Sequence, residues 1–150
     1  MSLHLRPARV DDTAAILGFI RELAEYEKLL DKCVATEEGL ARQLFGARPM
    51  AEVILAEWNG APVGFALFFH NFSTFLAKPG IYLEDLYVRP ALRGKGIGKA
   101  LLLELARLGK DRGCGRLEWS VLDWNTPSVE FYKSLGAVAQ DDWTTFRLLL

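Results

Sequence analysis

The chain has 150 residues, a length that suits one domain, and we expect residues 1–150 to share a single core. Its composition, 51% hydrophobic and 25% charged, excludes a largely disordered chain. The longest apolar runs, such as Val63–Phe69, have seven residues, far fewer than the ~20 that cross a bilayer, so we expect no membrane partner. The two cysteines and the absence of an export signal favour a reducing, cytoplasmic location. The cysteines and histidines lack zinc-ligand spacing, so we expect no metal.

Charge is distributed unevenly along the chain. Between Arg89 and Arg116 there are eight basic and two acidic residues, a net charge of +6, so the remainder carries −7. An ordinary charged surface explains this pattern, and so does a basic segment that binds a polyanion beside an acidic part that attracts a cation. Nucleic acid is not the expected polyanion, because no platform of aromatic residues accompanies the basic segment.

Periodicity and turn residues predict strands and helices along the whole chain. In chain order the predicted elements are a strand, two helices, a hairpin, a strand, a helix, a strand, a helix and two strand-like pieces: Leu3–Pro7, a helix from Asp11 or Asp12, Thr36–Gly46, Glu52–Trp58 with Val63–Phe69, Ile81–Val88, Ile97–Leu108, Arg116–Val121, Asn125–Leu135, Ala137–Ala139 and Thr144–Leu149. The first helix has an apolar stripe: Ile16, Leu17, Ile20, Leu23 and Ala24. The strand–helix–strand crossover after Ile81 implies a parallel pair. We therefore predict an α/β fold whose mixed sheet is antiparallel in its N-terminal part and parallel at its central pair, flanked by helices.

Three glycines fall within five residues, at Gly94–Gly98, between a predicted strand and a predicted helix. Such a loop turns tightly and presents successive backbone N–H groups, and the helix N-terminus and the basic residues around it favour binding of a pyrophosphate. A Walker A loop does not fit the glycine spacing, and a Rossmann fingerprint fails because Leu101 stands at its third glycine. A plain tight turn is the alternative.

Two motifs carry a resemblance to a known family. The segment Arg93–Gly98 (RGKGIG) resembles the R/Q-x-x-G-x-G/A signature of the GNAT superfamily of acetyl-CoA-dependent N-acetyltransferases. The segment Asn125–Ala137 is similar to the same family's N-x-P-[SA]-x-x-F-Y-x-x-x-G-[AF] helix. Three further segments, Arg6–Ala8, Glu22–Glu27 and Tyr82–Asp85, resemble the spermidine/spermine and thialysine acetyltransferase branch. The resemblance covers the whole chain and implies the GNAT fold.

The resemblance also implies a binding site for acetyl-CoA as cosubstrate. The backbone that would pair with the pantetheine arm belongs to Leu86, Tyr87 and Val88. The residues that would hold the pyrophosphate are Arg93, Gly94, Lys95, Gly96, Ile97, Gly98 and Lys99. Asn125 and Ser128 would line the thioester end, and Lys133 would reach a phosphate or lie outside the site.

Acetyl transfer to an amine needs a proton acceptor and a proton donor. A lysine-like amine with a pKa near ~10.4 is almost wholly protonated at pH 7, so a base must take its proton. Glu84 is the candidate base, acting directly or through water, and an ordinary surface carboxylate is the alternative. Tyr132 is the candidate general acid, because the resemblance places its hydroxyl near the thioester sulfur; a core aromatic is the alternative.

The expected acceptor is a small cationic amine: a diamine, a polyamine or a lysine-like amine. Its candidate contacts are Tyr26, Glu27, Glu84, Glu118 and Trp119. Lys28–Lys32 is less acidic than the matching stretch of polyamine acetylators, and Phe75 replaces an expected Trp, which favours a short acceptor. Amino acids, aminoglycoside-like amines and protein amino groups are alternative acceptors, and a non-catalytic acyl-CoA-binding module is the alternative function. The apolar C-terminus, Phe146–Leu150, predicts a homodimer.

Overall fold

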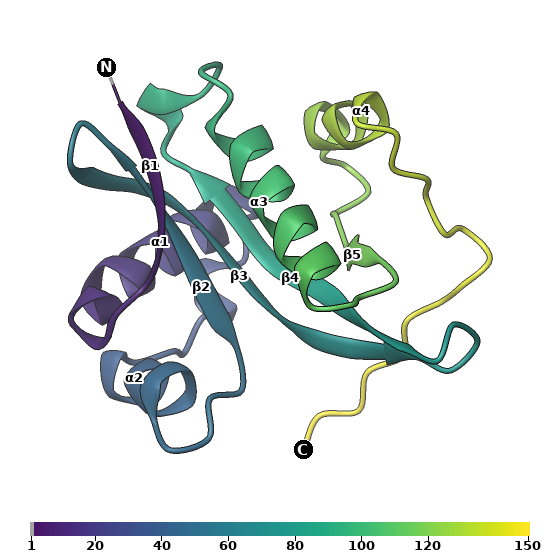
Figure 1. The fold of residues 1–150 in the computed structure, drawn as a ribbon. Coiled ribbons are helices and arrows are strands. Elements are labelled where there is room, and N and C mark those ends of the chain that lie inside the picture. Colours follow the sequence, from purple (N-terminus) through teal and green to yellow (C-terminus); the bar gives the residue numbers. More distant parts are fainter. Residues whose placement is uncertain (1) are drawn as a thin grey trace. The chain divides into compact units, whose positions relative to one another are not determined.

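A mixed five-stranded sheet organises the structure, a computed structural model that describes residues 2–150 (Figure 1). The chain forms two compact units, one that ends at Ser120 and one that spans Val121–Leu150. The elements of the first unit are β1 (Leu3–Pro7), α1 (Thr13–Tyr26), α2 (Glu37–Phe45), β2 (Glu52–Trp58), β3 (Ala61–Ser73), β4 (Lys78–Val88), α3 (Ile97–Asp111) and β5 (Leu117–Trp119). The second unit contains α4 (Thr126–Ser134). None of the helices in residues 2–150 combines the length and hydropathy that crossing a bilayer requires.

The sheet has the strand order β1-β2-β3-β4-β5. Each of the first three strands pairs antiparallel with the next, whereas β4 and β5, joined through α3, are parallel. This confirms the predicted α/β class with its mixed sheet. Figure 1 shows α1 and α2 on one side of the sheet and α3 on the other.

The helices α1 and α2 begin, end and pack largely as their sequences predict. The hydroxyl of Thr36 accepts a hydrogen bond from the backbone N–H of Gly39 at 3.0 Å, which caps α2, and the helix ends before Gly46. The predicted stripe of α1 holds in part, because Ile20 and Ala24 are only half-buried. The structure adds Phe19, whose buried ring stacks on Phe65 with 5.7 Å between centroids.

A β-bulge at Glu84 divides β4 into two halves that face different helices. Leu67 of β3 pairs with Asp85, but the next residue of β3, Phe68, pairs with Leu83, so Glu84 is the extra residue. Before the bulge, Ile81 lies beside Gly109 of α3. After the bulge, Tyr87 joins the core beneath α1. The bulge therefore turns Asp85 and Tyr87 toward α1, although an unbroken alternation would place them on the α3 side.

Beyond the bulge, β4 has a strand partner on one side only among residues 2–150. Its parallel pairing with β5 ends at Leu83 and Trp119, whereas its antiparallel pairing with β3 continues to Val88 opposite Gly64. The backbone of β4 that follows Asp85 therefore forms a sheet edge on the side of β5.

Gly64 permits the close approach of β3 to the last residues of β4, on the side opposite this edge. A Cβ at this position would lie 2.5 Å from the carbonyl oxygen of Tyr87 and 3.2 Å from the Cα of Val88. We therefore expect Gly64→Ala to destabilise the protein by about 1–3 kcal/mol in urea unfolding, because backbone must shift to admit the methyl group. Gly18→Ala in α1 is the control, because its Cβ meets nothing within 4 Å and alanine favours a helix. Equal urea midpoints for Gly64→Ala and Gly18→Ala would show that the close approach of the strands does not require glycine at position 64.

The second unit confirms the predicted helix and corrects the prediction that follows it. Asn125 caps α4, since its Oδ1 accepts from the backbone N–H of Ser128 at 3.4 Å. The strand-like pieces Ala137–Ala139 and Thr144–Leu149 were predicted wrongly, because the structure has no strand anywhere in residues 121–150. A β-favourable composition forms a strand only where another strand supplies hydrogen bonds, and none pairs with these segments among the described residues.

Candidate active site

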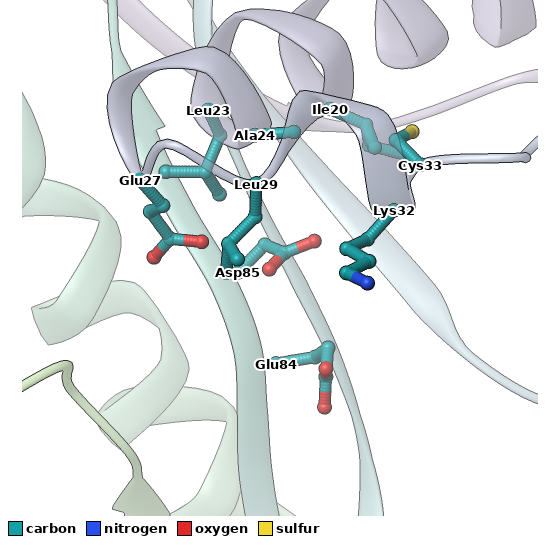
Figure 2. A pocket seen from close by; sticks show the side chains of 9 residues that line it. All are labelled: Ile20, Leu23, Ala24, Glu27, Leu29, Lys32, Cys33, Glu84 and Asp85. Carbon is teal, nitrogen blue, oxygen red and sulfur yellow. The ribbon is translucent and has the colours of Figure 1, made fainter. Parts of the chain in front are cut away.

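An acidic pocket of about 320 Å³ lies between α1, the segment that follows α1, and β4 (Figure 2). Its apolar lining comes from Ile20, Leu23, Ala24 and Leu29. Its polar lining comes from Glu27, Lys32, Cys33, Glu84 and Asp85. The pocket thus combines an apolar wall with converging charged groups, which is typical of small-molecule sites.

The β-bulge explains how two consecutive carboxylates reach one pocket. Consecutive side chains of a regular strand point to opposite faces of the sheet. Glu84 is the extra residue of the bulge and Asp85 the first residue after it, and both line the pocket. Figure 2 shows the Asp85 side chain below α1 and the side chain of the preceding residue, Glu84, further from this helix.

Electrostatics distinguish Asp85 from an ordinary surface carboxylate. Burial, followed by the negative charges of Glu84 and Glu27, raises the pKa of Asp85 to about 7. Burial and the charge of Glu84 likewise raise the pKa of Glu27. A carboxylate that titrates near neutral pH is suited to general base catalysis, so the pocket holds a candidate base that the sequence analysis had not singled out.

Two other acidic residues of the first unit, Glu22 and Glu118, form ion pairs with arginines. The carboxylate of Glu22, the first residue of the Glu22–Glu27 segment, contacts the Arg89 guanidinium at 3.1 Å and accepts a hydrogen bond from the Tyr87 hydroxyl at 3.0 Å. Glu118 contacts the Arg116 guanidinium at 3.2 Å and accepts from the Asn71 amide at 3.3 Å. These partners offset both charges, so the acidic character of the site rests on the pocket carboxylates.

Two aromatic residues of the predicted acceptor site lie on different elements. Tyr26 is at the end of α1, where the Arg93 guanidinium lies 5.2 Å from its ring centroid. Trp119 pairs with Leu83 at the last step of the parallel pairing. Their roles in acceptor binding stay predictions, as does that of Glu118.

The glycine loop has the backbone geometry that anion binding needs. Gly94 and Gly96 have φ of 80° and 82°, a left-handed conformation that side-chain-bearing residues rarely adopt. A Cβ at either position would project into open space, with nothing within 4 Å. The helix α3 begins directly afterwards, at Ile97, so its N-terminal amides and partial positive charge adjoin this space. The residues present therefore fit a pyrophosphate.

Two of the basic side chains of the loop are engaged within the protein. The Nε of Arg93 donates to the carbonyl of Val88 at 2.9 Å, which joins the loop to the end of β4. The ammonium of Lys95 lies 5.6 Å from the ring centroid of Trp58. Lys99 is exposed in the first turn of α3. Arg93 therefore helps to hold the loop in place, besides adding positive charge to it.

The remaining predicted site residues belong to the second unit. Asn125 and Ser128 form the capped start of α4, and Lys133 lies near its end. The ring of Tyr132 packs on that of Phe131, with 5.6 Å between centroids. Their predicted roles toward acetyl-CoA stay predictions.

No metal centre is evident in the described part of the chain. Within residues 2–150, no three or more His, Cys, Asp or Glu side chains are grouped so that they could hold a metal ion.

Comparisons with known proteins agree with this geometry. The thialysine N-epsilon-acetyltransferase of Sus scrofa is 40% identical over 97% of this chain and 92% of its own length. The L-ornithine N5-acetyltransferase of Arabidopsis thaliana is 33% identical over 99% of this chain and 85% of its own length. Among solved structures, an integron cassette protein from the mobile metagenome of V. cholerae superposes with a TM-score of 0.83 at 30% identity, covering 99% and 93% of the two chains.

The family assignment follows from a match over most of the chain. The sequence profile of the Acetyltransferase (GNAT) family matches residues 12–137, which include the glycine loop, the pocket strand and α4. The chain is therefore an N-acetyltransferase enzyme and belongs to the GNAT family.

Proposed function

We propose that the enzyme transfers the acetyl group of acetyl-CoA to a primary amine of a small cationic acceptor, by direct attack in a ternary complex. The observation that carries this proposal is the pocket with Glu27, Glu84 and Asp85, which adjoins the sheet edge at Leu86–Val88 on the same strand. Carboxylates attract an ammonium group, and the sheet edge provides a place for the acyl donor. The names of the thialysine and ornithine acetyltransferases also support a small amine acceptor.

The residues that would bind acetyl-CoA follow each other along the chain. The backbone of Leu86, Tyr87 and Val88 would pair with the pantetheine amides, because β5 has already separated from β4 there. The segment Arg93–Lys99 would hold the pyrophosphate through backbone N–H groups. Acetyl-CoA, when bound, supplies a thioester carbonyl that a neutral amine attacks.

The pair Glu84 and Asp85 would make the amine neutral. Glu84, exposed at the bulge, receives the proton from the ammonium directly or through water, and Asp85, with its pKa of about 7, holds it near neutral pH. Because the two carboxylates interact, the proton belongs to the pair. Glu27 would bind the cationic remainder of the acceptor.

Tyr132 would return a proton to the departing thiolate. It lies on α4 about two turns after the capping residue Asn125. The neutral phenol O–H of a tyrosine can donate a hydrogen bond to the thiolate anion. The products are an N-acetylated amine and free coenzyme A. The ammonium nitrogen loses two protons on the way to the amide, of which one ends on the thiol of coenzyme A and the other passes from the carboxylate pair to solvent, so each turnover releases one proton.

The proposal is tested by measuring thiol release from acetyl-CoA with a panel of amines. We expect acetyl-CoA binding in calorimetry and faster thiol release with diamines or lysine-like amines than with aminoglycosides. Acetylation of protein lysines without turnover of any small amine would instead identify a protein acetyltransferase. Tight binding of acetyl-CoA that no amine converts into thiol release would identify a non-catalytic acyl-CoA-binding module.

Gly96→Ala is expected to weaken acetyl-CoA binding about tenfold, because the new Cβ projects toward the pyrophosphate and strains a left-handed residue. Isothermal titration calorimetry measures this change. Gly60→Ala is the matched control, since Gly60 has φ of 86° and equally open surroundings in the β2–β3 turn. Both variants should lose similar stability, and only the first should lose affinity. Equal affinities of the two variants for acetyl-CoA would show that the glycine loop does not bind the pyrophosphate.

We also propose that the protein is a homodimer. The C-terminal segment exposes large apolar side chains, with Trp143, Phe146 and Leu148 each more than four-fifths exposed. Burial of these apolar side chains against a second copy of the chain is more favourable than their exposure to water. Sedimentation at micromolar concentration tests this, and a species of 16.8 kDa alone would contradict it.

A further inference from the structure

Lys32 places a primary amine of the protein itself in the pocket where an acceptor amine would react. It lies on the segment after α1, at the end of a short 3-10 helix, Leu30–Lys32. It lines the pocket together with the carboxylates of Glu27, Glu84 and Asp85. Figure 2 shows its side chain extending from this segment toward the strand that carries Glu84 and Asp85. The pocket therefore already contains an amine of the class that the enzyme would acetylate.

The ammonium of Lys32 is not held in place by an ion pair. Among residues 2–150, no ion pair with nitrogen and oxygen within 4.0 Å involves it. By contrast, Arg89, Arg112 and Arg116 each contact a carboxylate. Lys32 is also exposed, and a flexible stem of four carbons carries its ammonium. The ammonium can therefore move within the pocket without breaking an ion pair.

On the basis of the proposed acetyl transfer, we infer that the enzyme acetylates its own Lys32 when no free amine occupies the pocket. The Lys32 nitrogen loses a proton to the Glu84–Asp85 pair and attacks the thioester carbonyl of acetyl-CoA. A C–N bond forms, the C–S bond breaks, and the sulfur leaves with the bonding electron pair. Of the two protons that the nitrogen loses, one ends on the thiol of coenzyme A and the other passes to solvent. The products are N-epsilon-acetylated Lys32, coenzyme A and one proton.

Tethering favours this reaction over the acetylation of other lysines. Lys32 is attached to the wall of the pocket, so its effective concentration there exceeds that of an amine in dilute solution. The carboxylates that would deprotonate a free acceptor line the same pocket. Lys28 lies on the same segment but does not line the pocket, so it lacks both advantages.

A free acceptor and Lys32 would compete for the same space. The pocket has a volume of about 320 Å³, at the lower end of the range found for small-molecule sites. Two ammonium groups in it would also repel each other. An acceptor amine that occupies the pocket should therefore protect Lys32 from acetylation.

The test follows an isotopically labelled acetyl group from acetyl-CoA to the protein in the absence of amine, by intact mass and peptide mapping. We expect one labelled group per chain, at Lys32, with a rate constant that does not depend on protein concentration, because the reaction is intramolecular. The amine that releases thiol fastest in the panel should slow this labelling about tenfold or more when it is saturating. Lys32→Arg keeps the charge and should abolish the gain in mass.

Asp85→Asn separates enzymatic from spontaneous acetylation. It should slow the labelling of Lys32 about 100-fold, and it should leave the slow spontaneous labelling of Lys28 unchanged. Equal labelling of Lys32 and Lys28 in the wild-type protein, or an unchanged rate at Lys32 in D85N, would overturn the inference. If amines are acetylated but Lys32 is not, the inference fails and the proposed function stands. If neither is acetylated, the proposed function fails, and the inference fails with it.

Discussion

Asp85→Asn is expected to lower kcat/KM for the amine about 100-fold and to remove an inflection near pH 7 from its pH dependence. A proton acceptor works only when it is deprotonated. With the pKa of Asp85 at about 7, the wild-type value should rise about tenfold between pH 6 and pH 8. Steady-state thiol release across this range measures the effect.

Two further variants, Glu84→Gln and Glu25→Gln, test whether the inflection near pH 7 belongs to Asp85. Because the charge of Glu84 helps to raise the pKa of Asp85, Glu84→Gln should move the inflection to lower pH as well as reduce the rate. Glu25 lies in the last turn of α1, two residues before Glu27, but does not line the pocket, so Glu25→Gln should change neither quantity. An inflection near pH 7 that survives in D85N would assign it to another group.

The loss of activity in D85N can be distinguished from unfolding by its pH dependence. The pKa of Asp85 is raised from its ordinary value of 3.8 to about 7, so the ionised side chain destabilises the folded state. This cost is absent below pH 3.8 and complete above about pH 7. The D85N variant should therefore melt at or above the wild-type temperature at pH 8, and this advantage should vanish near pH 4.

Tyr132→Phe is expected to reduce kcat about 100-fold while leaving the Kd for acetyl-CoA within about twofold of the wild-type value. The substitution removes the hydroxyl that would protonate the leaving thiolate, and it keeps the ring that packs on Phe131. Calorimetry and steady-state kinetics on the same preparation separate binding from turnover.

Tyr82→Phe is a suitable control for the loss of a tyrosine hydroxyl. The hydroxyl of Tyr82 is 2.6 Å from that of Ser120, and this residue does not line the pocket. Its replacement should leave kcat within about twofold of the wild-type value. Near-normal turnover of the Tyr132→Phe variant would end the assignment of Tyr132 as the general acid.

Local signals made most of the elements predictable from the sequence. Thr36 and Gly46 mark the two ends of α2, as predicted. The hairpin turn at Asn59-Gly60 separates β2 from β3, as expected. The prediction stopped β3 four residues early, at Phe69, because the polar residues that follow break the apolar pattern. Pairing with β4 sustains those residues as strand, for example Asn71 opposite Gly80, and a pattern within one segment does not report such pairing.

The candidate site was predictable where it depends on motifs and not where it depends on contacts. The glycine loop and the acidic residues Glu27 and Glu84 follow from short stretches of sequence. The raised pKa of Asp85 does not, because it arises from a bulge and from burial below α1. Glu22 pairs with Arg89, which lies 67 positions away in the sequence. The sequence of α1 alone therefore suggests an unpaired negative charge at Glu22, whereas in the fold this charge is paired.

The strand order of the sheet bears on how the nascent chain acquires its structure. The strands β2, β3 and β4 lie in the sheet in the order in which they are synthesised and are joined by short turns, so β3 and β4 can each dock on its predecessor while the ribosome is still extending the polypeptide. Such sequentially local contacts form quickly. The pairing of β1 with β2 must wait for α1 and α2, and the pairing of β5 with β4 must wait for a complete crossover through α3, so these two pairings are the natural slow steps of assembly.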